Sequence, residues 1–389
     1  MSDSVPEGWV NKKFSEVITL QYGKSPQNVL DEDGEFPIWG TGGITGFANS
    51  YLHDGESIVI GRKGTIDKPN YVTGQFWAID TTYYIDDFKN CYSKWFYYKL
   101  LLTNLKKYNE ATGVPSLNRE TLYNIATVLP PLPEQQKIAS ILTSVDAVIE
   151  KTEAQINKLK DLKKAMMKEL LTKGIGHTEF KDSPVGRIPK SWAIKKLSEI
   201  AKKIKPGPFG SSLTKSMYVD VGYKVYGQEQ VISGNAYAGN YFIDEQKYEE
   251  LSSFRVLAGD VLISLVGTFG KILIIPDDFQ KGIINPRLIL LRFSADIELA
   301  FIEHQLKSYL VIEQLAKFQQ GGTMGVLSAT TLKPLYIVVP PISEQQQIAS
   351  ILTSIGTSIN EKEIKLSHTK SLKKALMQDL LSGKVRVAV

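Results

Sequence analysis

The feature that most constrains this chain is an internal repeat. The segment Pro130–Ser144, PPLPEQQKIASILTS, recurs as Pro340–Ser354, PPISEQQQIASILTS. The similarity continues to Leu170-Leu171 and Leu380-Leu381, and 20 of the 38 positions from 134 to 171 are identical to those from 344 to 381. Chance does not produce a match of this length, so the chain contains a duplicated half.

Looser matches upstream keep the same order in both halves. Pro6-x-x-Trp9 corresponds to Pro189-x-x-Trp192, and Gly64-Thr65 corresponds to Gly267-Thr268. The repeat therefore predicts two variable domains that alternate with two helices. The expected bounds are a first domain at 1–130, a first spacer helix at 131–175, a second domain at 176–340 and a second spacer helix at 341–389.

Each copy of the repeated segment has the pattern of a long helix. Apolar residues recur at steps of three and four, as in a coiled-coil seam. They are Ile138, Leu142, Val145, Ile149, Ile156, Leu159, Met166 and Leu170 in the first copy, and Ile348, Leu352, Ile355, Ile359, Leu366, Leu376 and Leu380 in the second. Gly174 and Gly383 stand where helix ends are expected. At ~1.5 Å per residue, 38 helical residues span about 57 Å.

The apolar stripe is wider than a two-helix seam needs. We expect the two helices to pair antiparallel within the chain and to leave a flank for helices of a partner protein. The pair Lys163-Lys164 recurs as Lys373-Lys374, and a solvated helix face is its simplest interpretation.

The variable regions combine short β-like runs with glycine-rich turns, which indicates an α+β (mixed α/β) domain in each half. Aromatic residues such as Trp95, Phe96 and Tyr226 are frequent there. Core packing explains most of them, although stacking on bases is an alternative use. The second region is longer, mainly between residues 205 and 255.

Several loops of both variable regions join glycine to basic and amide side chains. Glycine lets a backbone N–H approach a phosphate, Lys and Arg neutralise it, and Ser, Gln and Asn reach base edges. Such loops are also ordinary turns, but their recurrence at matching places favours nucleic-acid contact. The candidate DNA-binding residues are Lys24, Ser25, Gln27, Thr41, Arg62, Lys63, Thr65, Lys68, Asn118, Arg119, Lys205, Ser211, Ser212, Lys215, Thr268, Lys271, Arg287, Gln320 and Thr323.

Composition narrows the remaining classes. The single cysteine, Cys91, excludes an internal disulfide, and with four histidines it leaves no usual zinc cluster. A net charge of +5 is compatible with nucleic acid but does not establish it. The first residues carry no apolar signal segment and no run is long enough to span a membrane, so a cytoplasmic protein is expected.

Catalytic motifs are missing from the sequence. Gly270-Lys271 superficially resembles the end of a P-loop, but Leu265 replaces the required glycine and Ile272 the Ser or Thr. No Asp/Asn-Pro-Pro-aromatic tetrapeptide of amino-methyltransferases, nuclease pattern or Ser/His/Asp arrangement is found. We therefore expect no active site, no metal and no cofactor in this chain.

Taken together, these motifs resemble the DNA-specificity subunits of Type I restriction–modification systems over essentially the whole chain. The specific matches are Leu129–Ile138 and Val339–Ile348, each containing Pro-Pro…Glu-Gln-Gln ahead of a long helix. Supporting matches are Pro189-x-x-Trp192, Gly64-Thr65-Ile66, Gly267-Thr268-Phe269-Gly270-Lys271 and Pro115-x-Leu117-Asn118. Asp67 departs from the family pattern, which often has glycine there.

The resemblance implies two target-recognition domains that each read one half of a bipartite site in double-stranded DNA. It further implies that the antiparallel helices set the gap between the half-sites and dock two methyltransferase (modification) subunits, which bind S-adenosylmethionine and methylate adenine N6. Restriction subunits join the full complex. We expect Arg62, Lys63, Lys68, Lys215, Lys271 and Arg287 to face the DNA on one concave side.

Two other classes stay open at this stage. A protein-binding scaffold, with two modules on a coiled-coil spacer and no DNA readout, would show basic loops that face away from each other. A fused methyltransferase or nuclease would transfer methyl groups or cut DNA by itself, which the missing motifs disfavour. The DNA target cannot be read from one amino-acid sequence, because base specificity depends on side-chain geometry.

Overall fold

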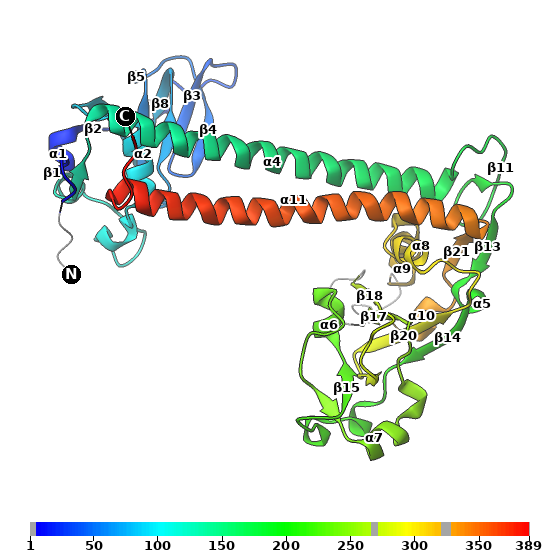
Figure 1. Cartoon of the computed structure of the whole chain (residues 1–389). Helices are drawn as coiled ribbons and strands as arrows, with labels where there is room; N and C mark the ends of the chain where they lie inside the picture. Colours follow the sequence, from blue (N-terminus) through cyan, green and yellow to red (C-terminus); the bar gives the residue numbers. More distant parts are fainter. Residues whose placement is uncertain (1–4, 266–270, 320–327, 389) are drawn as a thin grey trace. The chain divides into compact units, whose positions relative to one another are not determined.

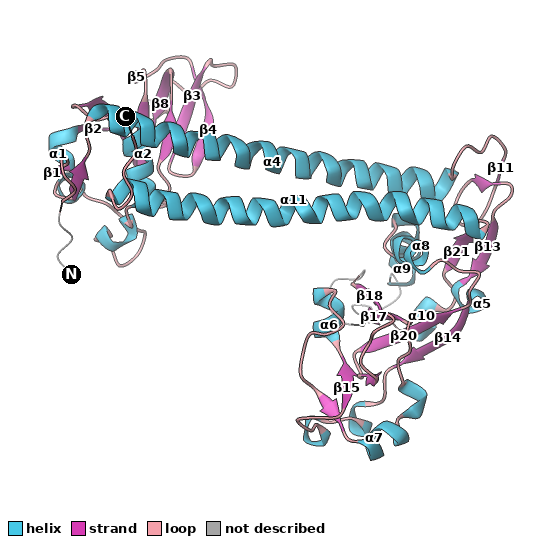
Figure 2. Cartoon of the chain, viewed as in Figure 1, coloured by secondary structure: helices cyan, strands magenta, loops and turns pink. Residues whose placement is uncertain are grey.

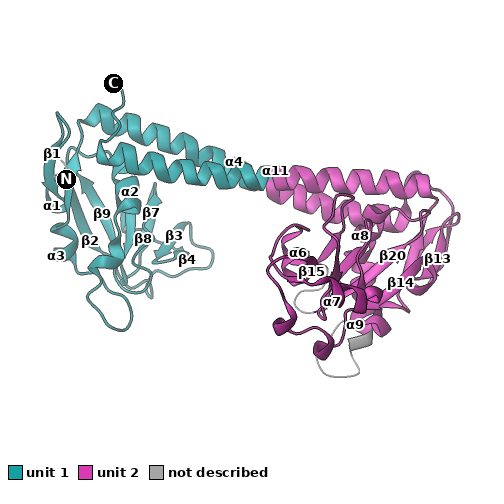
Figure 3. Ribbon diagram, turned by 60° about the horizontal axis from the view of Figure 1, so that its bottom comes forward, with its two compact units in different colours: residues 1–155, 362–389 teal, residues 156–361 magenta. Residues whose placement is uncertain are grey.

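The computed structural model describes residues 5–265, 271–319 and 328–388. The chain forms two compact units, the first made of Met1–Gln155 with Lys362–Val389 and the second of Ile156–Glu361 (Figure 3). Each unit contains a mixed α/β domain and one half of each of two long helices, which confirms the predicted fold class. Thr268, Gln320 and Thr323 lie outside the described residues.

The two long helices are α4 (Leu132–Lys173) and α11 (Ile342–Ser382) (Figure 1). Gly174 and Gly383 follow them with φ of 67° and 75°, the left-handed conformation that ends helices and favours glycine. The helices run antiparallel within each unit, as expected from the sequence. In the first unit Lys373 pairs with Asp146, and Lys370 with Glu153. None of the described helices is both long and apolar enough to cross a membrane.

The first unit contains three sheets. The central one is antiparallel, with strand order β2-β9-β6-β7, and the second, β4-β3-β8-β5, contains one parallel pair, β3 with β8. The third pairs β1 with β10. The strands are β1 (Val10–Lys13), β2 (Ile18–Tyr22), β3 (Phe36–Gly40), β4 (Gly43–Ala48), β5 (His53–Asp54), β6 (Ser57–Gly61), β7 (Asn70–Val72), β8 (Gln75–Ala78), β9 (Thr82–Phe88) and β10 (Ala126–Leu129), and the short helices are α1 (Phe14–Val17), α2 (Ser93–Leu102) and α3 (Arg119–Tyr123).

The second unit repeats this plan. Its central sheet has the order β14-β20-β17-β18, a second sheet β16-β15-β19 again contains one parallel pair, and β13 pairs with β21. The strands are β11 (Phe180–Lys181), β12 (Ile188–Pro189), β13 (Ala193–Lys196), β14 (Ala201–Pro206), β15 (Tyr223–Tyr226), β16 (Phe242–Ile243), β17 (Val261–Ser264), β18 (Ile272–Ile274), β19 (Gly282–Ile284), β20 (Leu288–Phe293) and β21 (Tyr336–Val339).

The longer stretch of the second domain contains two short α-helices that the first domain does not have between its corresponding strands. The helices of this unit are α5 (Leu197–Ile200), α6 (Gln228–Ser233), α7 (Glu245–Glu250), α8 (Leu299–Leu306), α9 (Tyr309–Gln319) and α10 (Ala329–Leu332). Of these, α6 (before β16 in the chain) and α7 (after it) lie in the stretch that is longer in the second half of the sequence. Figure 2 shows both helices. The duplicated halves therefore share a sheet topology and differ in what is inserted into it.

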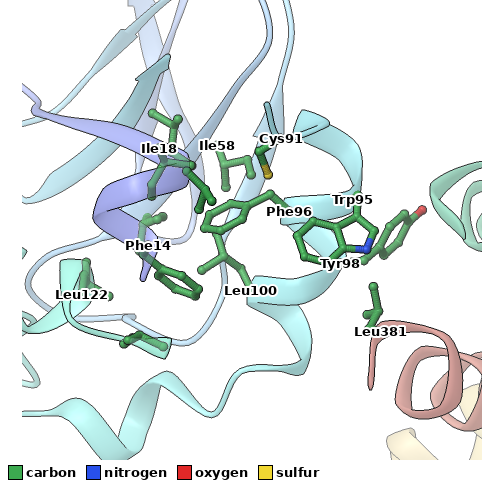
Figure 4. Close-up of a cluster of buried hydrophobic side chains, with 14 of the residues drawn as sticks. Phe14, Ile18, Ile58, Cys91, Trp95, Phe96, Tyr98, Leu100, Leu122 and Leu381 are labelled. Carbon is green, nitrogen blue, oxygen red and sulfur yellow. The ribbon is translucent and has the colours of Figure 1, made fainter. Parts of the chain in front are cut away.

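Aromatic side chains fill the core of the first unit (Figure 4). Trp95, Phe96 and Tyr98 of α2 are fully buried, and Phe14 packs edge-on against Phe96 with ring centroids 4.8 Å apart. Leu381, from the end of α11, contributes to the same cluster. The interpretation of these aromatics as core residues is confirmed, and the end of α11 forms part of the first domain's core.

A buried carboxylate fastens the start of α4 to the rest of the first unit. Glu134 accepts a hydrogen bond from the Trp9 indole N–H (Nε1–Oε2 2.9 Å). It also forms a bidentate ion pair with Arg386, with Nε–Oε1 2.7 Å and Nη2–Oε2 2.9 Å. Its side chain is 2% exposed. Glu134 thus joins Trp9, near the start of the domain, to the beginning of α4 and to Arg386, which follows α11.

The second unit contains the equivalent arrangement. Glu344 accepts the indole N–H of Trp192 (2.9 Å) and the Ile175 backbone N–H (3.0 Å), and His177 Nε2 lies 2.8 Å from its Oε1. The neighbouring glutamines also correspond: Gln135 Nε2 donates to the Pro130 carbonyl at 2.8 Å, and Gln345 Nε2 to the Pro340 carbonyl at 2.9 Å. The Glu-Gln repeat therefore has the same structural role in both units.

Replacing Glu134 by Gln is expected to lower the free energy of unfolding by about 2 kcal/mol, because the charge-assisted bonds from Arg386 are lost. Chemical denaturation followed by tryptophan fluorescence measures this. The adjacent, exposed Gln136 supplies the control, since Gln136→Ala should change stability by less than about 0.5 kcal/mol. Equal stabilities of the Glu134→Gln variant and the wild type would contradict the role of the carboxylate.

Acid should weaken the same interaction. Burial alone would raise the pKa of Glu134, but the hydrogen bonds from Arg386 and Trp9 outweigh it and hold that pKa below its usual value. A carboxyl group with a lowered folded-state pKa stabilises the fold above its unfolded pKa of about 4.3, and this contribution is lost as the pH falls through the folded-state pKa. Stability measured from pH 6 down to pH 3 should therefore fall less in Glu134→Gln than in the wild type.

Candidate nucleic-acid interface

Four of the sequence-predicted loops meet in the first unit at one end of its central sheet. The loop after β6 is tied to the 113–119 loop, because Gly64 N–H donates to the Pro115 carbonyl (2.8 Å) and Leu117 N–H to the Arg62 carbonyl (2.9 Å). A Cβ on Gly64 would lie 3.6 Å from Thr41 Oγ1, which brings the β3–β4 turn alongside. The loop after β2 begins at Tyr22, the last residue of that strand.

Two guanidinium groups share the face of one aromatic ring at this place. Arg62 lies 5.6 Å and Arg119 5.1 Å from the centroid of Tyr22, whose side chain is 45% exposed. Within the described residues Arg62 has no ion-pair partner, and the Nε–H groups of both arginines lack an acceptor. Arg119 is ion-paired with Glu120 at 3.9 Å. Arginines held over an aromatic ring present planar donors suited to phosphates or to guanine edges.

The other predicted residues of the first unit differ in how free their side chains are. Lys63 is exposed on the bridge to Ser116, and Lys24, Ser25, Gln27 and Lys68 are also exposed, whereas Thr65 is half-buried. Asn118 instead caps α3 by accepting the Glu120 N–H at 2.9 Å. Asp67, the departure from the family pattern, is paired with Lys106 at 2.7 Å, and that hydrogen bond lowers the pKa of Asp67.

The second unit brings three predicted basic residues to the corresponding end of its central sheet. Arg287 directly precedes β20, and its carbonyl accepts the Leu265 N–H at 2.9 Å. Lys271 faces the same strand end, where its carbonyl accepts the Ser264 N–H. Lys215 and Arg287 both line a hollow of about 390 Å³.

The hollow also contains residues that the sequence interpretation did not select. Gln228, at the start of α6, accepts from Arg287 Nη1 at 3.2 Å and donates to Ser264 Oγ at 2.9 Å, so it orients the guanidinium. Tyr218, Tyr241 and the acidic Glu229 line it as well. Only the fold brings Gln228 and Arg287 together, since 59 residues separate them.

The remaining predicted residues that the structure describes in the second unit lie at the end of β14 and in the turn that follows it. Lys205 packs its Nζ over the Phe254 ring at 4.5 Å, Ser211 is exposed, and Ser212 N–H closes a turn on the Phe209 carbonyl. Phe209 itself is 87% exposed. Each unit thus gathers its own basic residues, and the orientation of both groups toward one concave side stays a prediction.

Comparison with known proteins agrees with this architecture. The fold has a duplicated mixed domain, paired helices and a group of basic residues in each unit. The family model for the Type I restriction modification DNA specificity domain matches residues 6–161 and 189–367, so the chain belongs to that family.

Curated relatives carry the same description. The chain is 29% identical to the Type I restriction enzyme MjaVIII specificity subunit of Methanocaldococcus jannaschii, over 98% of this chain and 94% of the relative. It is 31% identical to the putative MjaX specificity subunit of the same organism, over 73% of this chain and 65% of the relative.

Solved structures show the same fold. The S subunit of a Type I system from M. genitalium aligns with a TM-score of 0.64 at 14% identity, over 98% of both chains. A chain from a study of complex assembly and conformational transition in a Type I system aligns with a TM-score of 0.57 at 16% identity, over 98% of this chain and 100% of the other. The family predicted from the repeat is therefore confirmed.

Two glycines test the packing of the loop cluster. A Cβ on Gly61 would lie 2.0 Å from the Thr65 carbonyl oxygen, so Gly61→Ala must push the basic loop open and is expected to cost about 2 kcal/mol of unfolding free energy. Gly113 has no atom within 4 Å of such a Cβ, and Gly113→Ala should be nearly neutral. Thermal unfolding of both variants measures the difference, which would vanish if Gly61 did not pack against the Thr65 carbonyl.

Proposed function

We propose that this chain is the DNA-specificity subunit of a Type I restriction–modification complex and that each domain reads one half of a bipartite site in double-stranded DNA. The observation that carries this is the equivalence of the two loop clusters. In both units the basic residues stand where the same three strands meet, at β2, β6 and β9 in one and at β14, β17 and β20 in the other. Side chains held on rigid strand ends supply fixed donors for base edges.

Differences between the clusters support unequal half-sites. The first offers Arg62 and Arg119 over the ring of Tyr22, and the second offers Arg287 oriented by Gln228. Because hydrogen-bond patterns in the major groove distinguish all four base pairs, different donor sets select different sequences. The proposed recognition domains are 1–130 and 176–340, with spacer helices at 131–175 and 341–389.

The helices are proposed to dock two modification subunits, with restriction subunits joining the full complex. Apolar side chains remain exposed on them: Leu162 is 46% exposed in the second unit and Leu372 is 55% exposed in the first. These leucines occupy the same place in the repeat, each followed by Lys-Lys-Ala. Exposed apolar residues at equivalent places suit two copies of one partner.

In this function the chain selects DNA and leaves the chemistry to its partners. The sequence lacks the motifs of methyltransferases and nucleases described above. Among the described residues, no group of three or more His, Cys, Asp or Glu side chains is arranged to hold a metal ion. A methyl-transfer assay of the isolated chain tests this, and activity without a partner would contradict it.

Arg119→Ala and Arg287→Ala should each affect one half-site. If the arginine contacts a base, its loss is expected to cost about 1–3 kcal/mol and to relax the methylated sequence on its own side; if it contacts a phosphate, affinity should fall uniformly and the salt slope by about one. Co-expression with the modification subunit, followed by mapping of methylated adenines, measures this. The control is Lys89→Ala, an exposed lysine just beyond the opposite end of β9.

Exchange of residues 1–130 for a related domain should change one half of the methylated site and leave the other intact. The same map of methylated adenines shows the outcome. A change in both halves would contradict independent reading by the two domains. A chain that binds its partner but shows no specific DNA binding would instead favour the protein-scaffold function.

A further inference from the structure

The lysine of the repeated Lys-Lys pair has a carboxylate partner in the first unit. Lys373 Nζ lies 2.5 Å from Asp146 Oδ1, and the Tyr98 hydroxyl donates to Asp146 Oδ2 at 2.7 Å. The same hydroxyl lies 3.1 Å from Thr143 Oγ1. The ammonium group of this lysine is therefore neutralised within the chain.

The second unit lacks the matching carboxylate. By the repeat, Lys163 corresponds to Lys373, Thr353 to Thr143 and Gly356 to Asp146. His304 takes the place of the tyrosine, since its Nε2 lies 3.2 Å from Thr353 Oγ1. A Cβ on Gly356 would lie 2.9 Å from Lys163 Nζ, so the lysine approaches the position that the aspartate occupies in the other unit.

Lys163 is half-buried and has no hydrogen-bond or ion-pair partner within the described part of the chain. The acid on the adjacent helix, Glu303, is paired with Lys307 at 2.5 Å. His304 adds no positive charge near neutral pH, because burial lowers its pKa to about 4. Burial and the charge of Lys307 also lower the pKa of Lys163. Glu303 thus acts on Lys163 only through its charge and forms its ion pair with Lys307.

Lys163 opens into a groove of about 840 Å³ between α4 and the α8–α9 corner. Tyr309 (37% exposed) and Ile312 (50% exposed) are apolar parts of its lining, together with Met167 and Ile359. The ionisable side chains that line it are Lys160, Lys163, Lys164, Lys168, Lys307, Asp161 and Glu313. The groove is therefore apolar inside and positively charged at its edges.

We propose that this groove binds an amphipathic helix of the modification subunit and that a carboxylate on that helix pairs with Lys163. This rests on the proposed function and names the chemistry of one of its two docking surfaces. An apolar helix face fits an apolar groove, and the acidic side chain supplies the charge that Asp146 supplies in the first unit. The two docking surfaces of the chain are accordingly unequal.

The test is a titration of the full-length chain with its modification subunit, followed by sedimentation. Lys163→Met keeps the length of the side chain and removes its charge, and it should weaken the binding of one modification subunit at least about tenfold. Gly356→Asp supplies the carboxylate within the chain and repels the incoming one, so it should weaken the same binding step. The other modification subunit should bind as before.

Two controls separate loss of contact from loss of folding. Lys158→Met changes an exposed lysine on the same helix outside the groove and should bind like the wild type. Gly356→Asp removes a glycine from a helix interior and adds an ion pair, so its thermal stability should equal or exceed that of the wild type. If Gly356→Asp is at least as stable as the wild type but binds the modification subunit more weakly, the loss of binding is due to the groove and not to unfolding.

Carbodiimide cross-linking, which joins amines to carboxylates directly, identifies the contact. Mass spectrometry should find Lys163 linked to an Asp or Glu of the modification subunit, and in G356D the link should form within the chain. If the wild type does not bind the modification subunit at all, the proposed function fails. If it binds and both variants bind equally well, only the groove assignment is overturned.

Discussion

Each unit depends on a carboxylate buried in the first turn of a long helix. Glu134 and Glu344 take charge-assisted or polar hydrogen bonds from a tryptophan near the start of their domain and from residues that follow the other long helix. A buried carboxylate without these donors is unfavourable by several kcal/mol, so the donors must be in place when the unit is folded. The two ends of the helix pair are thereby fixed to the two domains, and the loop clusters stand on sheets attached to that frame.

The sequence was sufficient for the architecture but not for the contacts. The repeat predicted the helices because Pro-Pro, apolar spacing and glycine stops are local signals. The repeat singled out Glu134 but did not show which residues it contacts, because Trp9 and Arg386 are 125 and 252 residues away in the sequence. The basic loops were found by composition, whereas the stacking of Arg62 and Arg119 on Tyr22 depends on strand pairing. Asn118 stays a predicted DNA ligand, and the sequence interpretation did not identify that its Oδ1 also caps α3.

The two duplicated halves share some structural features and differ in others. The order of the central sheet, the Trp–Glu hydrogen bond and the glutamine bonds to proline carbonyls are the same in both units. The loop residues and the helices α6 and α7 differ between the units. The Asp146–Gly356 difference lies on the long helices, so the two halves have also diverged away from their loop clusters.

The first unit is assembled from two stretches that lie far apart in the sequence. The second, Ile156–Glu361, is one continuous stretch. On the ribosome the second unit's residues are all available before the last stretch of the first has emerged. Leu381 and Arg386, which complete the core and the ion pair with Glu134, are made only after the whole second unit. The core of the first unit therefore cannot close until the chain has been synthesised through the second, and until then the apolar face of its helix lacks the partner residues that bury it.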